Sequence, residues 1–326
     1  MAAICSSDSA ERAARLAGTP VRSVEPGGRG GNNRLERVTA GNGRRFALKS
    51  YPRTAGDSRD RLGAEFAALS FLRRNDVAEV PAALARDDDS GHGLYEWIEG
   101  EPVGAAGPAD LDAALAFAAR LHGLRHAEGA ERLGWASEAC TSGIELIRQV
   151  ETRLVRLRQV AADHAGLGEL LEGGIAPILQ QSAGAAGFGP LPPECRTLSP
   201  ADFGFHNALR RPDGSLVFLD FEYFGWDDPV KLAAEFPLHP GQSLDAGLCA
   251  RWRRGIAGVY EDVPGFAGRL AAFRPLFVAR WALIVLNEFL PERWARRVAA
   301  GETDAAAARM RQLAKAAALL ERVNET

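Results

Sequence analysis

The stretch SPADFGFHNALRRPDGSLVFLDFEYFGWDDP, residues 199–229, combines acidic and amide side chains with an expected pair of short strands. Apolar residues flank its Pro-Asp-Gly turn at 212–214, and Asp-Gly between apolar runs is a strong signal for a β-hairpin. Such a hairpin brings Asp220, at the end of its second strand, back beside Asp202 and Asn207. Two carboxylates and an amide oxygen then meet at one end of a small sheet. Because Mg²⁺ takes one or two carboxylates and completes its shell with water and phosphate oxygens, this stretch predicts a magnesium–phosphate site.

The same segment resembles the catalytic segment of the aminoglycoside phosphotransferase and choline kinase family, which are small-molecule kinases with a protein-kinase-like fold. The resemblance rests on D-x-x-x-x-N, from Asp202 to Asn207, and on a strand that ends in L-D-F-E at residues 219–222. It implies that Asp202 is the catalytic base and that Asn207 and Asp220 are the metal ligands, in agreement with the general template for phosphoryl transfer. Residues 202–204 also spell D-F-G, the metal motif of protein kinases. No H-R-D-like segment precedes them, so the metal-binding Asp is assigned to Asp220.

Turn chemistry is the alternative interpretation of this segment, because Asp, Asn and Gly are common turn residues and D-x-x-x-x-N alone is a weak pattern. The strand end at Asp220 and a lysine upstream in a strand favour catalysis. The chain departs from the family at one point, since Pro200 and Ala201 replace the His-Gly that usually precedes the catalytic Asp. That His generally braces the loop, and His206 is a candidate to compensate for its loss.

Composition sets broad limits on the protein. The 326 residues are 46% hydrophobic and 25% charged, as in a globular chain of one large or two modest domains. The net charge of -3 and the scattered arginines give no reason to expect nucleic acid or an anionic membrane as partner. No run approaches the ~20 apolar residues of a membrane span, and the N-terminus lacks the plan of a secretory signal. The four cysteines are far apart, so we expect reduced thiols in a cytoplasmic protein of unspecified oligomeric state.

A glycine-rich segment, GGRGGNN at residues 27–33, lies between two predicted strands, and a hairpin with an Asn-Gly turn follows. Glycines here let backbone N–H groups approach a phosphate. The segment is neither a Walker A loop nor a Rossmann fingerprint, because a strand and not a helix comes next. A flexible connection is the alternative, but the position before the hairpin favours a loop that covers a nucleotide. In the resembling family such a loop ends in Asn, so Gly30, Gly31 and Asn33 are the expected nucleotide-binding residues.

A strand lysine and a helix glutamate complete the expected nucleotide site. The strand F-A-L-K is analogous to V-A-I-K of protein kinases, and it places Lys49 on the face opposite Phe46 and Leu48. Residues 57–74 are predicted to form a helix, with Glu65 at the edge of its apolar stripe. A kinase fold uses such an ion pair to aim the lysine at the α- and β-phosphates. A solvated strand lysine is the alternative, which the presence of Glu65 disfavours.

The segment GLYEWI resembles the hinge of the family, where the backbone of Glu96, Trp97 and Ile98 would take the edge of the base. From residue 109 onward the pattern is mainly helical. The resemblance implies an α+β, two-lobed protein-kinase-like fold. Its N-lobe, residues 1–99, has a small antiparallel sheet, the glycine-rich loop and one helix. Its C-lobe, residues 100–326, is large and mainly helical, and carries the catalytic β-hairpin.

The expected function is Mg²⁺-dependent transfer of the γ-phosphoryl group of ATP, or another NTP, to a hydroxyl of a small molecule. Metabolite, sugar and aminoglycoside-like acceptors stay open, because related kinases line this pocket with divergent C-terminal helices; Arg280, Trp281 and Glu288 are candidate contacts there. A weak or inactive nucleotide-binding pseudokinase of the same fold is one alternative, which the missing His-Gly favours. A protein kinase is another, but no A-P-E-type end of an activation segment follows Asp220.

Overall fold

The computed structural model describes residues 7–29, 33–52, 59–299 and 301–325. The chain forms two compact units. The first comprises Met1–Ser137 and Leu198–Trp226, and the second comprises Glu138–Thr197 and Asp227–Thr326. The chain passes from one unit to the other three times, between Ser137 and Glu138 and within two short strands, β7 (Thr197–Ser199) and β10 (Gly225–Asp227). The boundary between lobes at residues 99 and 100 stays a prediction.

The first unit contains a five-stranded antiparallel sheet in the order β1-β2-β3-β5-β4. Its strands are β1 (Val21–Arg29), β2 (Arg34–Ala40), β3 (Arg45–Ser50), β4 (Ala83–Asp87) and β5 (His92–Glu96). Phe46 and Leu48 of β3 are buried in an apolar cluster with Val38 of β2. Ala47 and Lys49 alternate with them, so side chains on the opposite face of β3 are available to the site. The predicted strands and their alternation are therefore confirmed.

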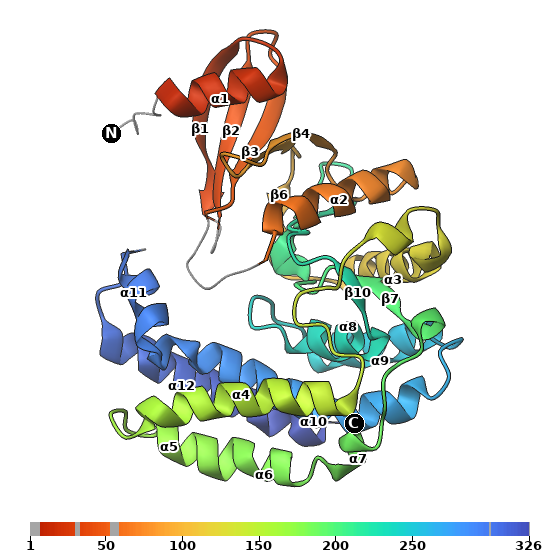
Figure 1. The fold of residues 1–326 in the computed structure, drawn as a ribbon, viewed down its shortest axis with the longest axis vertical. Coiled ribbons are helices and arrows are strands. Elements are labelled where there is room, and N and C mark those ends of the chain that lie inside the picture. The colour runs from red at the N-terminus through yellow and green to blue at the C-terminus, as the bar shows by residue number, and fades with distance from the viewer. Residues whose placement is uncertain (1–6, 30–32, 53–58, 300, 326) are drawn as a thin grey trace. The chain divides into compact units, whose positions relative to one another are not determined.

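Two helices contact this sheet, whereas the sequence pattern predicted one. α1 (Ser7–Ala17) packs on β1, β2 and β4 and buries Ala13 in the apolar cluster of β3 (Figure 1). α2 (Arg61–Arg74) contacts β4 and β5 and buries Glu65. Its N-cap is Asp60, whose carboxylate accepts a hydrogen bond from the Gly63 N–H at 2.9 Å. α2 thus begins later than the predicted residue 57, which lies outside the described residues.

The predicted catalytic hairpin is also confirmed. It consists of β8 (Ala208–Arg210) and β9 (Leu216–Phe218), with the short β6 (Glu101–Pro102) paired to the outer edge of β8. The turn is closed by a 2.9 Å bond from the Arg211 N–H to the Ser215 carbonyl, and Gly214 adopts the left-handed φ of 88° that this turn requires. A 3₁₀ turn, η5 (Phe205–Asn207), precedes β8.

Four phenylalanines join the catalytic hairpin to α3 (Pro108–Gly123). The ring centroid of Phe117 on α3 lies 4.5 Å from the ring centroid of Phe218 on β9. It lies 5.7 Å from that of Phe203 and 6.2 Å from that of Phe221. Phe203 follows Asp202 and Phe221 follows Asp220 in the chain. Asp202 and Asp220 are therefore each followed by a buried phenylalanine whose ring packs near Phe117 of α3. Two 3₁₀ turns follow α3 in this unit, η1 (Leu124–His126) and η2 (Ala130–Arg132).

The second unit is helical, as predicted. α10 (Phe266–Val285) packs against α4 (Gly143–Ala161), α8 (Pro229–Glu235) and α12 (Ala305–Glu321) (Figure 1). The other elements are α5 (Leu167–Glu169), η3 (Leu170–Ile175), α6 (Ala176–Gln180), α7 (Ala183–Ala186), η4 (Pro193–Cys195), η6 (Phe236–Leu238), α9 (Ala246–Val259), η7 (Leu286–Phe289), α11 (Pro291–Ala299) and η8 (Arg322–Asn324).

α10 corrects one expectation about membrane spans. With η7 it forms the stretch Phe266–Phe289, which is long and apolar enough, by length and composition, to cross a membrane. However, 56% of this stretch's most apolar window is buried inside the protein. Arg269 and Arg280 on the same helix are buried as ion pairs with Asp228 and Glu235. These features make α10 the core helix of the second unit.

Candidate functional site

A cavity of about 440 Å³ lies within the first unit, a size that suits a small-molecule ligand. It is lined on one side by β3 and β5 and on the other by the catalytic hairpin and the loop before it. Most of the predicted site residues line it: Asn33, Lys49, Glu65, Glu96, Ile98, Asp202, Asn207 and Asp220. Trp97 is not part of this lining, and Gly30 and Gly31 lie outside the described residues.

Lys49 forms the centre of the charged end of this cavity. Its Nζ donates to Glu65 Oε2 at 2.6 Å and to Asp220 Oδ1 at 2.5 Å, and lies 3.9 Å from Glu222 Oε2. Burial by itself disfavours the ammonium, but the three carboxylates outweigh this and raise the pKa of Lys49. Lys49 is therefore a charged lysine in the cavity, and not the solvated strand lysine that was the alternative.

Glu65 is held from three directions. Its Oε2 accepts hydrogen bonds from Lys49 and, at 2.5 Å, from the Tyr51 hydroxyl, while its Oε1 accepts from the Phe221 N–H at 3.4 Å. Burial raises the pKa of Glu65, whereas the positive charge of Lys49 acts in the opposite direction. Three donors are therefore arranged around a carboxylate that would be costly to bury without them.

Asn207 and Asp220 have the donor atoms that Mg²⁺ requires. The Asn207 amide nitrogen donates to the Asp202 carbonyl at 3.0 Å, so its oxygen is the group left to face a ligand. The backbone connects the two residues, because the Leu219 N–H donates to the Asn207 carbonyl at 2.8 Å. Asp220 has a left-handed φ of 65°, which is uncommon for a residue other than glycine, and its side chain is 33% exposed. Both oxygen donors line the cavity, so this set fits a magnesium ion.

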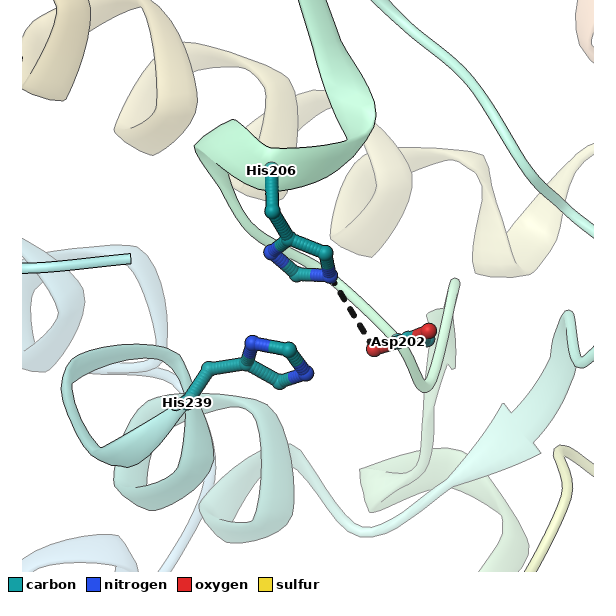
Figure 2. A group of neighbouring side chains, drawn as sticks. All are labelled: Asp202, His206 and His239. Carbon is teal, nitrogen blue, oxygen red and sulfur yellow. Dashed lines mark hydrogen bonds and ion pairs between the residues drawn. The ribbon is translucent and has the colours of Figure 1, made fainter. Parts of the chain in front are cut away.

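Asp202 follows a tight turn formed by Pro200 and Ala201, the two residues that stand in place of His-Gly. The Asp202 N–H donates to the Pro200 carbonyl at 2.8 Å, and Ala201 adopts a left-handed φ of 64°. Figure 2 shows the His206 ring turned toward the Asp202 carboxylate, with His206 Nε2 3.3 Å from Asp202 Oδ1. Backbone strain of this kind is concentrated at functional sites. The candidate base is thus held in a fixed, strained turn beside an imidazole.

Comparison with known proteins identifies the family of this chain. A model of the phosphotransferase enzyme family matches residues 23–261. The chain belongs to this family. A comparison with curated proteins finds no match for this family member.

Solved structures share the fold of this phosphotransferase-family protein. A spectinomycin phosphotransferase in complex with ADP and spectinomycin aligns with a TM-score of 0.67 at 10% identity, covering 99% of this chain and 98% of that one. The gentamicin complex of the phosphotransferase APH(2″)-IIa gives 0.64 at 15%, with coverages of 98% and 96%. The choline kinase LicA of Streptococcus pneumoniae gives 0.58 at 16%, with coverages of 95% and 96%. The α+β fold of protein-kinase-like small-molecule kinases is therefore confirmed.

A second layer of this family member's site was not predicted from the sequence. Glu222 is buried, its Oε2 accepts a hydrogen bond from the Asn33 amide, and it lies 3.8 Å from Arg61 Nη1. Arg61, at the start of α2, donates to Asn33 Oδ1 at 3.1 Å and to the Pro52 carbonyl at 2.6 Å. Asn33 is therefore joined to the residues that surround Lys49. The only sequence signal for Glu222 was its place in L-D-F-E, and Arg61 had none.

The structure shows which polar groups of the predicted hinge already have hydrogen-bond partners. The Glu96 N–H donates to the Ala82 carbonyl at 2.9 Å and the Glu96 carboxylate accepts from the Ala82 N–H, so these groups are occupied. Among the described residues, none accepts a hydrogen bond from the Ile98 N–H, and the Ile98 side chain lines the cavity. Contact of this segment with a base stays a prediction.

One candidate acceptor contact on the C-terminal helices is wrong. Arg280 is 1% exposed, and its guanidinium donates to the Glu235 carboxylate and to the Gln149 side chain. A buried arginine with these partners is a structural residue of the second unit, because breaking its ion pair would leave Glu235 as an unpaired buried charge. Helical periodicity placed Arg280 on α10 but could not determine that it faces the core.

Proposed function

We propose that this protein transfers the γ-phosphoryl group of ATP, or another NTP, to a hydroxyl of a small molecule, with Mg²⁺ as cofactor. The observation that carries the proposal is Lys49, bonded to both Glu65 and Asp220 in a cavity that Asp202 and Asn207 also line. The arrangement matches the parts that phosphoryl transfer requires, namely a cation for the phosphates, oxygen ligands for a metal and a base for the acceptor. The acceptor is a hydroxylated metabolite, sugar or aminoglycoside-like compound, and a cytoplasmic location belongs to the same proposal.

Lys49 would hold the nucleotide through the one N–H that its carboxylate partners leave available. An ammonium has three N–H groups, and Glu65 and Asp220 accept two of them. The third would donate to an oxygen of the α- or β-phosphate. Asn207 and Asp220 would hold Mg²⁺, which neutralises charge on the phosphate oxygens.

Asp202 would orient the acceptor hydroxyl and take its proton. The acceptor oxygen forms a bond to the γ-phosphorus, and the bond between this phosphorus and the β–γ bridging oxygen breaks. The nucleoside diphosphate leaves with that electron pair, and the acceptor proton ends on the Asp202 carboxylate. Positioning and charge stabilisation supply most of the rate in such reactions, so the fixed turn at Asp202 and the buried Lys49–Glu65 pair are central.

Asp220→Asn is expected to weaken Mg²⁺-dependent nucleotide binding by at least about tenfold, because a ligand with a negative charge is replaced by a neutral one. Asn keeps the shape of the side chain and tolerates the left-handed backbone at this position. The measurement is the thermal shift produced by ATP with Mg²⁺ and with a chelator. In the wild type, ligand at 100 times its Kd stabilises the folded state by ~2.7 kcal/mol.

Asp213→Asn is the matched control for this experiment. Asp213 is an exposed carboxylate in the turn of the same hairpin and bonds to Ser215. This variant should keep the full Mg-ATP shift. An Asp220→Asn protein that kept the same shift would contradict the metal assignment. ATP consumption in the presence of a panel of hydroxylated metabolites, sugars and aminoglycosides tests the reaction itself. If none of these acceptor classes gave a phosphorylated product, that result would favour the pseudokinase.

His206→Gln is expected to lower turnover about tenfold, the effect of losing a hydrogen bond worth ~1.5 kcal/mol to an ionised group. The imidazole contacts the Asp202 carboxylate and lies close to the point where the acceptor proton is received (Figure 2). Affinity for Mg-ATP should stay at the wild-type value, because this residue has no assigned contact with the phosphates. Unchanged turnover would remove His206 from the site, and a loss of Mg-ATP affinity would place it elsewhere.

A further inference from the structure

A buried hydrogen-bond chain runs from the wall of the cavity to the Lys49–Glu65 pair. Tyr51 lies two residues after Lys49, directly after the last residue of β3. Its hydroxyl oxygen lies 2.5 Å from Glu65 Oε2 and 2.7 Å from the hydroxyl of Tyr95 on β5. The tyrosines are 6% and 3% exposed, and Tyr95 lines the cavity. The two tyrosine hydroxyls therefore connect the Lys49–Glu65 pair to the part of the cavity wall that Tyr95 forms.

The groups in this hydrogen-bond chain determine which of them donates in each contact. An ionised Glu65 can only accept hydrogen bonds, so Tyr51 donates its single hydroxyl hydrogen to Glu65. Tyr51 then has only its oxygen to offer, so Tyr95 is the donor in the contact between the two hydroxyls. Burial raises the pKa of both tyrosines, with the charge of Glu65 acting in the same direction. Both hydroxyls therefore keep their protons at neutral pH.

Glu65 needs this support because other carboxylates compete for Lys49. The Lys49 ammonium is 2.5 Å from Asp220 and 3.9 Å from Glu222, as well as 2.6 Å from Glu65. With one partner less, the buried Glu65 would lose much of what offsets its desolvation. The ring of Tyr51 also lies 5.1 Å from Lys49 Nζ, within the range of a cation–π contact.

We propose that Tyr51 is a positioning residue that fixes the Glu65–Lys49 pair in the geometry that receives the nucleotide phosphates, and that Tyr95 orients the Tyr51 hydroxyl. This inference rests on the proposed function. It adds two residues to which the kinase-like motifs give no role, since Tyr51 lies just after the A-L-K strand and Tyr95 just before the three residues whose backbone is expected to contact the base.

Gly93 on β5 supports the assignment of Tyr95. It lies opposite Lys49 in the pairing of β3 with β5, while Tyr95 lies opposite Ala47. A Cβ atom at position 93 would lie 2.4 Å from the Tyr95 hydroxyl oxygen. The absence of a side chain at Gly93 therefore leaves room for the Tyr95 ring to extend along the strand to Tyr51. Gly93→Ala should displace this hydroxyl and give the same loss as removing it.

The test is Tyr51→Phe, with Tyr95→Phe as the matched control. Loss of a hydrogen bond to a charged group predicts that kcat/KM for Mg-ATP falls about 10- to 100-fold in Tyr51→Phe. Tyr95→Phe removes only the neutral contact behind it and should give a smaller loss. The KM of the acceptor should not change in either variant, since Asp202 is not part of the chain. Equal losses in the two variants, or no loss in Tyr51→Phe, would overturn the proposal.

A double-mutant cycle separates positioning from a general loss of structure. If Tyr51 acts through Glu65, adding Tyr51→Phe to Glu65→Gln should lower kcat/KM no further than Glu65→Gln alone. Independent structural damage would instead multiply the two losses, and that result would overturn the proposal.

A readout without nucleotide distinguishes this inference from the proposed function. The Phe221 N–H donates to Glu65 Oε1, so a loosened Glu65 should expose it. We expect amide hydrogen exchange in the peptide that contains Phe221 to be faster in Tyr51→Phe than in Tyr95→Phe or the wild type. If exchange changes in this way but the wild type neither binds Mg-ATP nor phosphorylates any acceptor, the arrangement stands and the proposed function fails. Unchanged exchange in Tyr51→Phe overturns the positioning role regardless of activity.

Discussion

Asp202→Asn is expected to leave the protein folded and to lower turnover by ~10²–10⁴, the range for loss of a positioned general base. The amide has the size of the carboxylate, but it cannot accept the acceptor proton. The turn itself should persist, because the bond from the residue 202 N–H to the Pro200 carbonyl and the stacking of Phe203 on Phe117 do not involve the carboxylate.

Steady-state phosphorylation of the best acceptor and the thermal shift with Mg-ATP measure the two parts of this prediction. The Mg-ATP shift should stay close to that of the wild type, since Asp220 and Lys49 are unchanged. Near-full turnover would overturn the assignment of Asp202 as base. Loss of both turnover and the shift would instead show that the substitution disturbs Asn207, whose side chain donates to the Asp202 carbonyl, and Asp202→Ser should then give the same double loss.

The placement of Lys49, Asn207 and Asp220 around one cavity could be predicted because it depends mostly on local geometry. The Asp-Gly turn determines that a hairpin brings Asp220 back to Asn207, and strand alternation determines the side of β3 on which Lys49 lies. Glu65 lies on α2, the helix that follows the strand of Lys49, and the order of motifs in kinases predicted that the two residues form an ion pair. These relations need only short-range rules and one family pattern.

The supporting residues could not be predicted, because their contacts join distant parts of the chain. Asn33 and Glu222 are 189 positions apart, and nothing in either segment specifies that the two side chains meet. Tyr95 lies in β5 and Tyr51 directly after β3, and their hydroxyls meet only when β3 and β5 pair. α1 was missed because its alanine-rich sequence has few large apolar residues, although Asp8 in its first turn and Arg15 in its last are typical of a helix.

Apolar periodicity also could not predict which residues of the second unit's helices are buried. On α4, the apolar residue Ile144 is 54% exposed, whereas Leu146, two positions on, is buried. The N-cap of α8 is Asp228, whose carboxylate accepts a hydrogen bond from the Val230 N–H at 3.0 Å. The cap could be predicted from Asp-Pro at the start of a helix, but its buried partner on α10 could not.

Arg269→Met is expected to lower the free energy of unfolding by ~3–5 kcal/mol, the cost of removing one member of a buried ion pair. Arg269 is 5% exposed, and its Nε donates to Asp228 Oδ2 at 2.5 Å. Its other nitrogens donate to the carbonyls of Gly189 and Thr141. Methionine fills much of the same volume but leaves a buried carboxylate unpaired, so most of the loss is electrostatic.

The pH dependence of this loss identifies its cause. Burial raises the pKa of Asp228 to about 6, although Arg269 acts to lower it, so removing Arg269 raises this pKa further. A carboxyl whose pKa is higher in the folded than in the unfolded state destabilises the fold when it is ionised, and this penalty disappears as the pH falls through the folded pKa. Denaturant unfolding at pH 5 and pH 8 should therefore show a smaller difference between Arg269→Met and the wild type at pH 5.

Two further variants decide between lost charge pairing and lost packing. Arg269→Met combined with Asp228→Asn should recover part of the stability, because no unpaired charge is then buried. Arg158→Met, which removes an exposed pair with Glu172, should have little effect. If the double variant were no more stable than Arg269→Met, and the loss were equal at both pH values, packing of the arginine stem and its two carbonyl contacts would account for the effect. The ion pair between α10 and the cap of α8 would then contribute little to the stability of the second unit.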